Sequence, residues 1–250
     1  MVARSVRVAE VAGSNPAVPT AGEARPVCHT VSAVGAPPQL CALVESRREP
    51  LQKLGPKHRM CRRVGAAVCG RPNCPTNKRP YPPGQHGRGR RRLTEYHVRM
   101  LEKQKLRAMY GVGERQFRRY FQLATRRRAV TGEELLRLLE TRLDTLVLRL
   151  GFAQTVRQAR QLVTHGHMAL DGRRVDLPAI AVRPGQTIQA TPAARNFISV
   201  REAIEVTPDP PPYLERDKEA VSGRLVRWPE RSEIPLAVEV EERLIVEFMS

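Results

Sequence analysis

Four residues with metal-binding side chains lie close together in the sequence: His58, Cys61, Cys69 and Cys74. Two, seven and four residues separate them in turn, so the first pair can bind one ion from a single turn. Imidazole nitrogens and thiolate sulfurs are ligands that Zn²⁺ prefers, and four of them complete its tetrahedron. The sequence therefore predicts a structural zinc site with no open position for catalysis. A loop of small residues without a metal is the alternative.

The other two of the five cysteines, Cys28 and Cys41, lie upstream of this group. An odd number of cysteines, without a secretory signal, disfavours a disulfide framework and indicates a reducing compartment. The predicted ligands lie in a stretch with Gly65, Gly70 and Pro75, which offers little hydrophobic core. A bound metal would stabilise such a stretch.

Positive charge is concentrated in one part of the chain. The net charge is +18, and residues 50–142 carry 24 basic and 6 acidic side chains, whereas residues 196–250 carry 7 and 12. A block of one sign is typical of a surface that binds the phosphates of a nucleic acid, with a solvated basic face as the alternative. Only five Phe, five Tyr and one Trp are present, which argues against rows of rings that stack single-stranded bases. No run approaches the roughly 18 apolar residues of a membrane span.

Candidate RNA-binding side chains fall in three kinds of segment. Residues 79–92 are rich in Pro, Gly and Arg, so they favour an extended arm that orders on RNA, with a flexible linker as the alternative. The other segments are basic helix faces and a helix followed by a basic hairpin, which suits docking on a structured RNA. The complete set is Arg79, Arg88, Arg90, Arg91, Arg92, Lys103, Lys105, Arg115, Arg118, Arg157, Arg160, Gln161, His165, Arg173 and Arg174.

Three helices are predicted to follow the arginine-rich arm. The first has its N-cap at Thr94 and ends near residue 109, the second covers roughly 114–127, and the third opens with a capping box of Thr131 and Glu134. The period of 3.6 residues predicts that the first helix has a buried apolar face and an opposite basic face. The apolar face comprises Val98, Leu101, Ala108 and Met109, and the basic face comprises Arg99, Lys103 and Arg107.

A short helix–hairpin unit is predicted next. Residues 143–150 form an apolar helix, and Thr155 opens a second helix that runs through Val163. Residues 167–170 and 173–175 read as two short strands joined by a tight turn at Asp171-Gly172, and 182–190 supplies further strand.

Six motifs of this chain resemble one protein family, the universal small-subunit ribosomal protein number four in its bacterial or organellar form. They are 79–87 (RPYPPGQHG), 102–106 (EKQKL), 113–117 (GERQF), 142–144 (RLD), 158–163 (QARQLV) and 172–175 (GRRV). The segments 54–57 (LGPK) and 243–248 (RLIVEF) also look like that family. The similarity covers about residues 54–250, and several of the motifs are specific.

The resemblance implies an α+β fold, in which a mostly helical first domain carries an inserted helix–hairpin RNA-binding domain of the alpha-L type. It divides the chain into a basic N-terminal domain with zinc loop and helices at 54–142, an inserted RNA-binding domain at 143–193, and a C-terminal segment at 194–250 that packs on the first domain. Residues 1–53 have no counterpart in the family. They are predicted to be a disordered extension or the product of an overextended gene start.

The resemblance also implies a function. Members of the family are structural constituents of the small subunit that bind its rRNA early, nucleate assembly of the subunit body and contribute to decoding accuracy. Implied partners are small-subunit rRNA, other small-subunit proteins, notably number five, and messenger RNA near its entry path, on a cytoplasmic rather than an organellar ribosome. Some members bind zinc through four cysteines in the first loop, and His58 stands in the position of the first of these.

The alternative is an RNA-modifying enzyme that uses the same RNA-binding motif. Residues 142–145 (RLDT) resemble the signature of pseudouridine synthases around their catalytic aspartate, which would be Asp144. In those enzymes a large catalytic domain follows the motif, whereas here only about 55 residues follow it, and this segment is acidic and has few strand patterns. Asp144 is therefore expected to be structural, and the protein is not expected to be an enzyme.

Overall fold

The computed structural model describes residues 58–71, 73–89 and 94–250. The predictions for residues 1–53, for Cys28 and Cys41, and for Arg90, Arg91 and Arg92 lie outside these residues. No helix in the described ranges is both long and apolar enough to cross a membrane.

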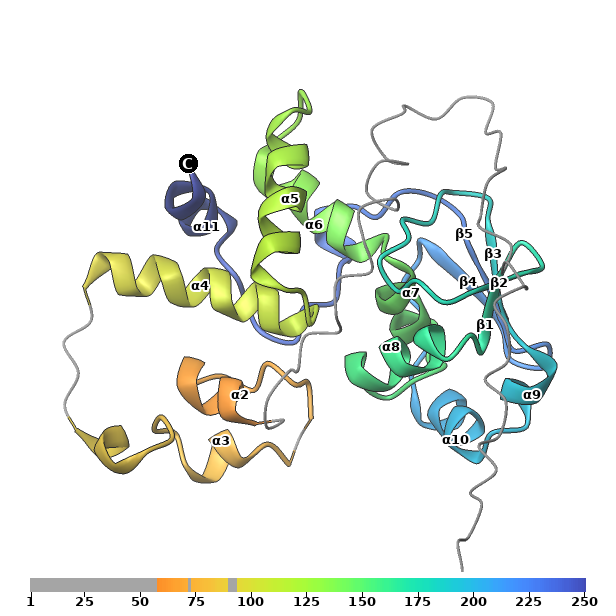
Figure 1. The fold of residues 1–250 in the computed structure, drawn as a ribbon, viewed down its shortest axis with the longest axis horizontal. Helices are drawn as coiled ribbons and strands as arrows, with labels where there is room; N and C mark the ends of the chain where they lie inside the picture. The colour runs from red at the N-terminus through yellow and green to blue at the C-terminus, as the bar shows by residue number, and fades with distance from the viewer. Residues whose placement is uncertain (1–57, 72, 90–93) are drawn as a thin grey trace, which may run out of the picture. The chain divides into compact units, whose positions relative to one another are not determined.

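The described part of the chain begins with helices (Figure 1). They are α2 (Arg59–Val64), α3 (Pro75–Lys78), the 3-10 helix η1 (Gln85–Arg88), α4 (Glu95–Met109), α5 (Glu114–Thr125) and α6 (Thr131–Glu140). The predicted N-cap of α4 is confirmed, because the Thr94 hydroxyl accepts a hydrogen bond from the backbone amide of His97 at 3.3 Å. The predicted capping box of α6 is wrong: Thr131 is already helical, and the N-cap is Val130. The Glu134 carboxylate instead pairs with Arg127 and Arg137.

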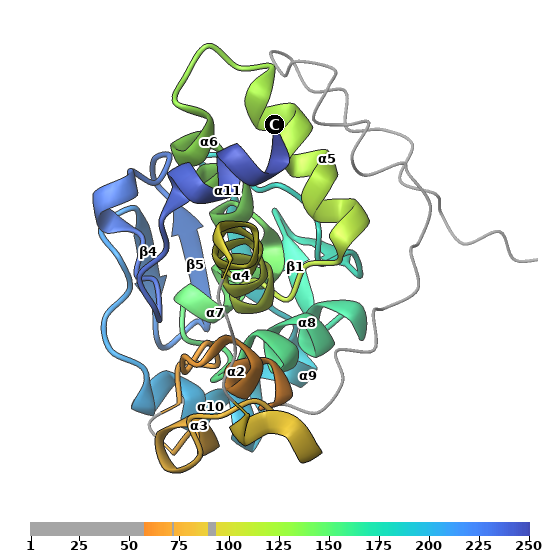
Figure 2. The same ribbon diagram turned by 90° about the vertical axis from the view of Figure 1, so that its left-hand side faces the viewer.

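The predicted faces of α4 are wrong in one respect. Val98 is 38% exposed, whereas Lys103, which is predicted to face solvent, is only 5% exposed. The reason is that α4 has neighbours on more than one side, since it contacts both α2 and the C-terminal helix α11 (Glu242–Met249). Figure 2 shows α11 lying beside α4 and α6. A basic side chain can be buried there because an acidic partner, Glu114, pairs with it.

The predicted helix–hairpin unit is present. Helices α7 (Leu143–Arg149) and α8 (Val156–Thr164) precede the strands β1 (Met168–Leu170) and β2 (Arg173–Val175). These strands pair antiparallel, with Leu170 opposite Arg173. The turn between them has positive φ at both Asp171 (49°) and Gly172 (79°), as a type I′ turn requires.

The sheet contains five strands in the order β2-β1-β3-β5-β4. Its third strand is β3 (Thr187–Ala190), and the last two, β4 (Leu214–Asp217) and β5 (Ser222–Leu225), come from the acidic C-terminal segment. The remaining elements are α9 (Pro192–Arg195), α10 (Ile198–Val206) and the 3-10 helix η2 (Arg231–Glu233). Helices in the first part with a small antiparallel sheet after them confirm the predicted α+β class.

The C-terminal segment, which is predicted to pack on the first domain, also contacts the predicted inserted domain. Its strands extend the sheet of the predicted inserted domain, because β5 pairs with β3 through Thr187–Arg224 and Ile188–Gly223. Its later part contacts the first domain, since α11 contacts α4 and α6 and η2 contacts α6. The buried apolar residues form one large cluster around α7, α8 and the sheet and a second around α4, α5, α6 and α11. The segment contributes to both, so it ties the two cores together.

Candidate metal centre and RNA-binding surface

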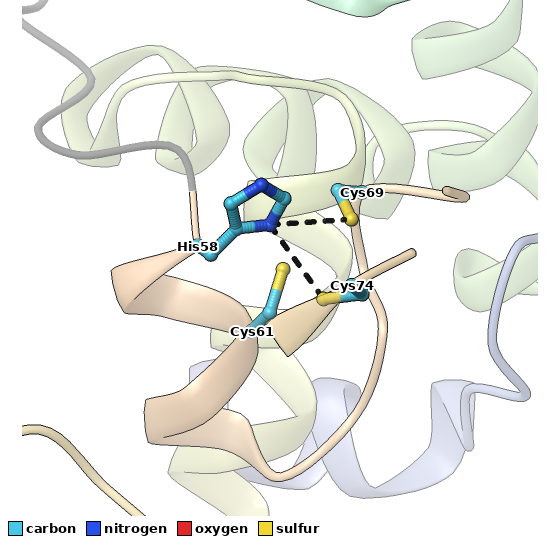
Figure 3. Close-up of side chains that lie close together, drawn as sticks. All are labelled: His58, Cys61, Cys69 and Cys74. Atoms are coloured by element: carbon cyan, nitrogen blue, oxygen red, sulfur yellow. Dashed lines mark hydrogen bonds between the residues drawn. The ribbon is translucent and has the colours of Figure 1, made fainter. Parts of the chain in front are cut away.

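The four predicted metal ligands lie together (Figure 3). His58 caps the N-terminus of α2, Cys61 lies one turn into that helix, and Cys69 and Cys74 come from the loop that leads to α3. The Nδ1 atom of His58 is 3.7 Å from the Sγ atom of Cys69 and 3.6 Å from that of Cys74. All four ligand atoms lie within 4.8 Å of one another.

These distances suit a tetrahedral Zn²⁺ ion. With Zn–S bonds of about 2.3 Å and Zn–N bonds of about 2.0–2.1 Å, the N···S edge of a tetrahedron is about 3.6 Å and the S···S edge about 3.8 Å. The two measured N···S distances match that edge. Three thiols and one imidazole are also a donor set that zinc favours over harder cations. The residues present therefore fit the predicted metal.

The protonation of the thiols is uneven. Burial raises the pKa of Cys61 to about 12. Burial also disfavours a charge on Cys74, but hydrogen bonds with the Thr76 hydroxyl (3.3 Å), the Thr76 amide, Cys69 and His58 outweigh it and lower the pKa of Cys74 to about 6. A metal needs thiolates, so Cys74 offers one near neutral pH, whereas Cys61 has to release its proton when an ion binds.

One arginine links the ligand cluster to the proline-rich arm. Arg62, next to Cys61 in α2, donates hydrogen bonds to the carbonyl oxygens of Tyr81 (3.2 Å) and Pro82 (3.4 Å). Its guanidinium also lies 5.1 Å from the centre of the Tyr81 ring. Arg88 lies 5.0 Å from the same ring and donates a hydrogen bond to the Tyr81 hydroxyl (3.4 Å). The arm is therefore held by α2, the helix that contains Cys61 and has His58 as its N-cap.

Several predicted RNA-binding residues are on the surface. Arg79, Arg88, Arg115, Arg118, Gln161, His165, Arg173 and Arg174 are exposed, and Arg157 is half-buried in α8. The structure brings part of this set together, because Arg174 of β2 donates a hydrogen bond to the backbone oxygen of His165 at the end of α8 (3.0 Å). The guanidinium of Arg118 lies 3.8 Å from the Glu114 carboxylate, but the Arg118 side chain is still 68% exposed.

Three other members of the predicted set have internal partners. Lys103 pairs with Glu114 at 2.6 Å and lies 4.7 Å from the centre of the Phe248 ring. Lys105 pairs with Glu102. Arg160 donates to the backbone oxygen of Gly111 at 2.7 Å and pairs with a buried carboxylate. These contacts give Lys103, Lys105 and Arg160 packing roles within the protein, and their part in RNA binding stays a prediction.

The carboxylate that Arg160 contacts is Asp144. It is fully buried, and the guanidinium of Arg142 binds both of its oxygens, at 3.0 and 2.6 Å. Arg160 binds one of these oxygens at 2.9 Å, and Arg142 also donates to the Tyr120 hydroxyl at 2.7 Å. Burial opposes the charge of Asp144, but the two arginines outweigh it and lower its pKa. Because two arginines hold Asp144 in the interior, it cannot reach a nucleotide. The pseudouridine synthase alternative therefore has no accessible catalytic aspartate.

A second buried network, centred on Glu140, has no motif in the sequence. Its carboxylate accepts hydrogen bonds from the hydroxyls of Tyr110 (2.7 Å) and Tyr213 (2.9 Å) and pairs with Arg149. Burial and the neighbouring carboxylate raise the pKa of both tyrosines, so both remain donors at any ordinary pH. In the sequence, only the size of these side chains and the apolar residues around them indicated that they are buried. Their hydrogen-bond partners could not be read from the sequence, because they lie up to 73 positions away.

Two regions of the chain match models of known domain families. Residues 52–140 match the ribosomal protein S4/S9 N-terminal domain, and residues 141–188 match the S4 domain. The chain is 53% identical over 197 residues to the small ribosomal subunit protein uS4 of Geobacillus thermodenitrificans. The aligned region covers 78% of this chain and 97% of the relative. The chain belongs to the uS4 family. It is also 48% identical over 206 residues to the uS4 protein of Thermus thermophilus, which covers 79% of this chain and 98% of that relative.

Membership of the uS4 family confirms the resemblance predicted from the motifs, together with a ribosomal role rather than an enzymatic one. The two matched uS4 regions meet between residues 140 and 141, where both buried networks are found. Glu140 and Arg142 lie on either side of that junction and contact residues from before and after it. The sequence motif RLD is thus explained by structure, as part of the junction between the two regions.

Proposed function

We propose that this protein is a structural constituent of the small ribosomal subunit that binds small-subunit rRNA early and nucleates assembly of the subunit body. Near-complete coverage of uS4 relatives at about half identity carries this proposal. The exposed basic residues of the arm, α5 and β2, with the half-buried Arg157 of α8, give it a physical basis, because clustered arginines bind phosphates. The relatives come from bacteria, which favours a cytoplasmic ribosome.

Residues 54–142 and 143–193 are the two rRNA-binding domains in this proposal, and residues 194–250 join them. The RNA contacts proposed for the first domain come from Arg79, Arg88, Arg90, Arg91, Arg92, Arg115 and Arg118. Those proposed for the second come from Arg157, Gln161, His165, Arg173 and Arg174. In the proposal, ribosomal protein number five and messenger RNA near its entry path are neighbours on the ribosome, through which the protein contributes to decoding accuracy.

His58, Cys61, Cys69 and Cys74 hold one structural Zn²⁺ ion in this proposal. A closed four-ligand site supplies no reaction; it fixes a loop that has little apolar core of its own. The N···S distances and the low pKa of Cys74 support it. Elemental analysis should find about one zinc per chain, and Cys69→Ser should abolish it, whereas Cys28→Ser and Cys41→Ser should not. His58→Cys should retain zinc, and less than about a tenth of an equivalent in reconstituted wild type would contradict the site.

Sedimentation tests the ribosomal function directly. In a lysate at physiological salt, the tagged protein should sediment with small subunits, and the purified protein should bind small-subunit rRNA more tightly than an unrelated RNA of equal length. The matched control is a pseudouridine assay on the same rRNA with wild type and Asp144→Ala. Protein that stays in the soluble fraction would contradict the ribosomal function, and pseudouridine that depends on Asp144 would establish the enzyme instead.

A further inference from the structure

Three aromatic rings meet beside the basic hairpin. The ring centres of His165 and His167 are 6.0 Å apart, and His167 contacts Phe197 edge-to-face with 4.9 Å between centres. His165 ends α8, His167 precedes β1, and Phe197 precedes α10, so the contact depends on tertiary structure. Figures 1 and 2 both show α9 and α10 next to each other near one end of the sheet.

This ring cluster (His165, His167 and Phe197) is accessible. His165 is exposed, and the other two rings are half-buried. The next residue, Ile198, is 75% exposed, which is the largest exposed fraction among the large apolar side chains that the structure describes. Phe197 also packs against the core around α7, α8 and the sheet, whereas His165 and Ile198, the residue next to Phe197, present aromatic and apolar surface to solvent within a strongly basic protein.

The ring cluster has a cationic border. Arg174 donates to the backbone oxygen of His165, and its guanidinium lies flat against Gly166, where an added Cβ would come within 2.2 Å of Nε. Exposed Arg195 and Arg201, which come before and after Phe197 in the sequence, are fixed by hydrogen bonds to the backbone oxygens of Ala190 and Arg195, both at 3.2 Å. Planar rings with fixed guanidiniums around them offer stacking for a base and charge for its phosphates.

We propose that the ring cluster, with Ile198 and its arginine border, is a binding site for an unpaired nucleotide of RNA. The inference rests on the proposed rRNA-binding function. It adds selectivity for an unpaired nucleotide, which positive charge alone does not provide. Arginine–phosphate contacts carry no sequence information by themselves, whereas a base that stacks on these rings has to be unpaired. The site would therefore select a bulge or loop of the rRNA. The scarcity of aromatic residues excludes rows of stacked bases but not one such position.

Two matched pairs of variants test the site in the full-length zinc-bound protein. The probe is the small-subunit rRNA of Geobacillus thermodenitrificans, the source of the 53% identical relative. His165→Leu should weaken binding about tenfold, within the range that one stacked base contributes, and His165→Phe should bind as wild type does. Ile198→Ser should also weaken binding, whereas Val206→Ser, at a similarly exposed position (73%) of the same helix, should not. Ile198→Ser should leave the salt dependence of binding unchanged, because no charge is removed.

Ultraviolet cross-linking of the wild-type complex supplies the second readout. Cross-links from His165 or Phe197 to a nucleotide outside the paired regions of the rRNA would support the site. Cross-links to paired nucleotides alone, cross-links to another protein in assembled subunits, or wild-type affinity in both His165→Leu and Ile198→Ser would overturn it. In each of these cases the wild type still binds rRNA, so the proposed function stands. Loss of rRNA binding by the wild type itself would overturn the proposed function and this inference with it.

Discussion

At the scale of single residues, the partners of a charged side chain decide its role more than its type does. Asp144 stands in a motif that resembles a catalytic one, yet Arg142 and Arg160 enclose it in the interior. Lys103 and Arg160 count as basic residues in the sequence, but Glu114 and Asp144 neutralise them. The sequence predicted a structural role for Asp144 only through comparison with the pseudouridine synthases. It could not reveal the ion pairs of Lys103 and Arg160, whose partners lie 11 and 16 positions away.

Replacing Asp144 by Asn should destabilise the protein strongly. The substitution keeps the shape but leaves the fully buried guanidinium of Arg142 without a counter-charge, at a cost of about 3–5 kcal/mol in the free energy of unfolding. Urea unfolding measures this loss, and Asp176→Asn, at an exposed position, is the control. Equal stability of Asp144→Asn and Asp176→Asn would contradict the role assigned to the pair.

The same substitution has a defined pH dependence. The folded-state pKa of Asp144 lies below its ordinary value, so ionised Asp144 contributes stability in full above the unfolded pKa of about 3.9. That contribution is lost as pH falls through the lower folded-state pKa. The difference in unfolding free energy between wild type and Asp144→Asn should therefore be constant above about pH 5 and shrink below pH 4.

At the scale of elements, local signals were reliable where the chemistry is local. The Thr94 cap, the glycine in the β1–β2 turn and the spacing of the metal ligands each involve groups a few residues apart, and each prediction agrees with the structure. The strands β4 and β5 were missed because each has only four residues, with three charged residues in β4 and one in β5, and each depends on pairing with its neighbours in the sheet. The cap predicted at Thr131 failed because Arg127 and Arg137 bind Glu134 instead.

Arg62 should couple the metal loop to the arm. Arg62→Ala removes two hydrogen bonds to the backbone oxygens of Tyr81 and Pro82, so amides of η1 (Gln85–Arg88) should exchange about tenfold faster, while zinc is retained. Hydrogen-exchange mass spectrometry measures this, and Arg63→Ala, the exposed neighbour in α2, is the control. Chelation of zinc should accelerate the same amides in wild type more than in Arg62→Ala. Equal acceleration in both would show that the loop and the arm are independent.

At the scale of the whole molecule, charge is separated along the chain while buried polar contacts hold its parts together. The basic block lies in residues 50–142. The acidic segment, residues 196–250, supplies strands to the sheet and a helix to the core around α4, α5 and α6. The Glu140 network joins Tyr110, Arg149 and Tyr213, so it connects three distant parts of the sequence through one carboxylate. Such an arrangement leaves the basic residues at the surface in fixed positions, which suits a protein that binds a large structured RNA.

Salt dependence should report how much of that basic block contacts rRNA. If Arg90, Arg91 and Arg92 each neutralise a phosphate, replacing all three by Ala should weaken binding and reduce the slope of log affinity against log salt by about 2–3, since each contact releases about one counterion. Filter binding between 50 mM and 300 mM salt measures the slope. Lys218→Ala with Arg243→Ala, which removes two exposed charges from the acidic segment, should leave it unchanged. An unchanged slope in the triple variant would show that these arginines face solvent or messenger RNA instead of rRNA. The rRNA contacts of the first domain would then be made by Arg79, Arg88, Arg115 and Arg118.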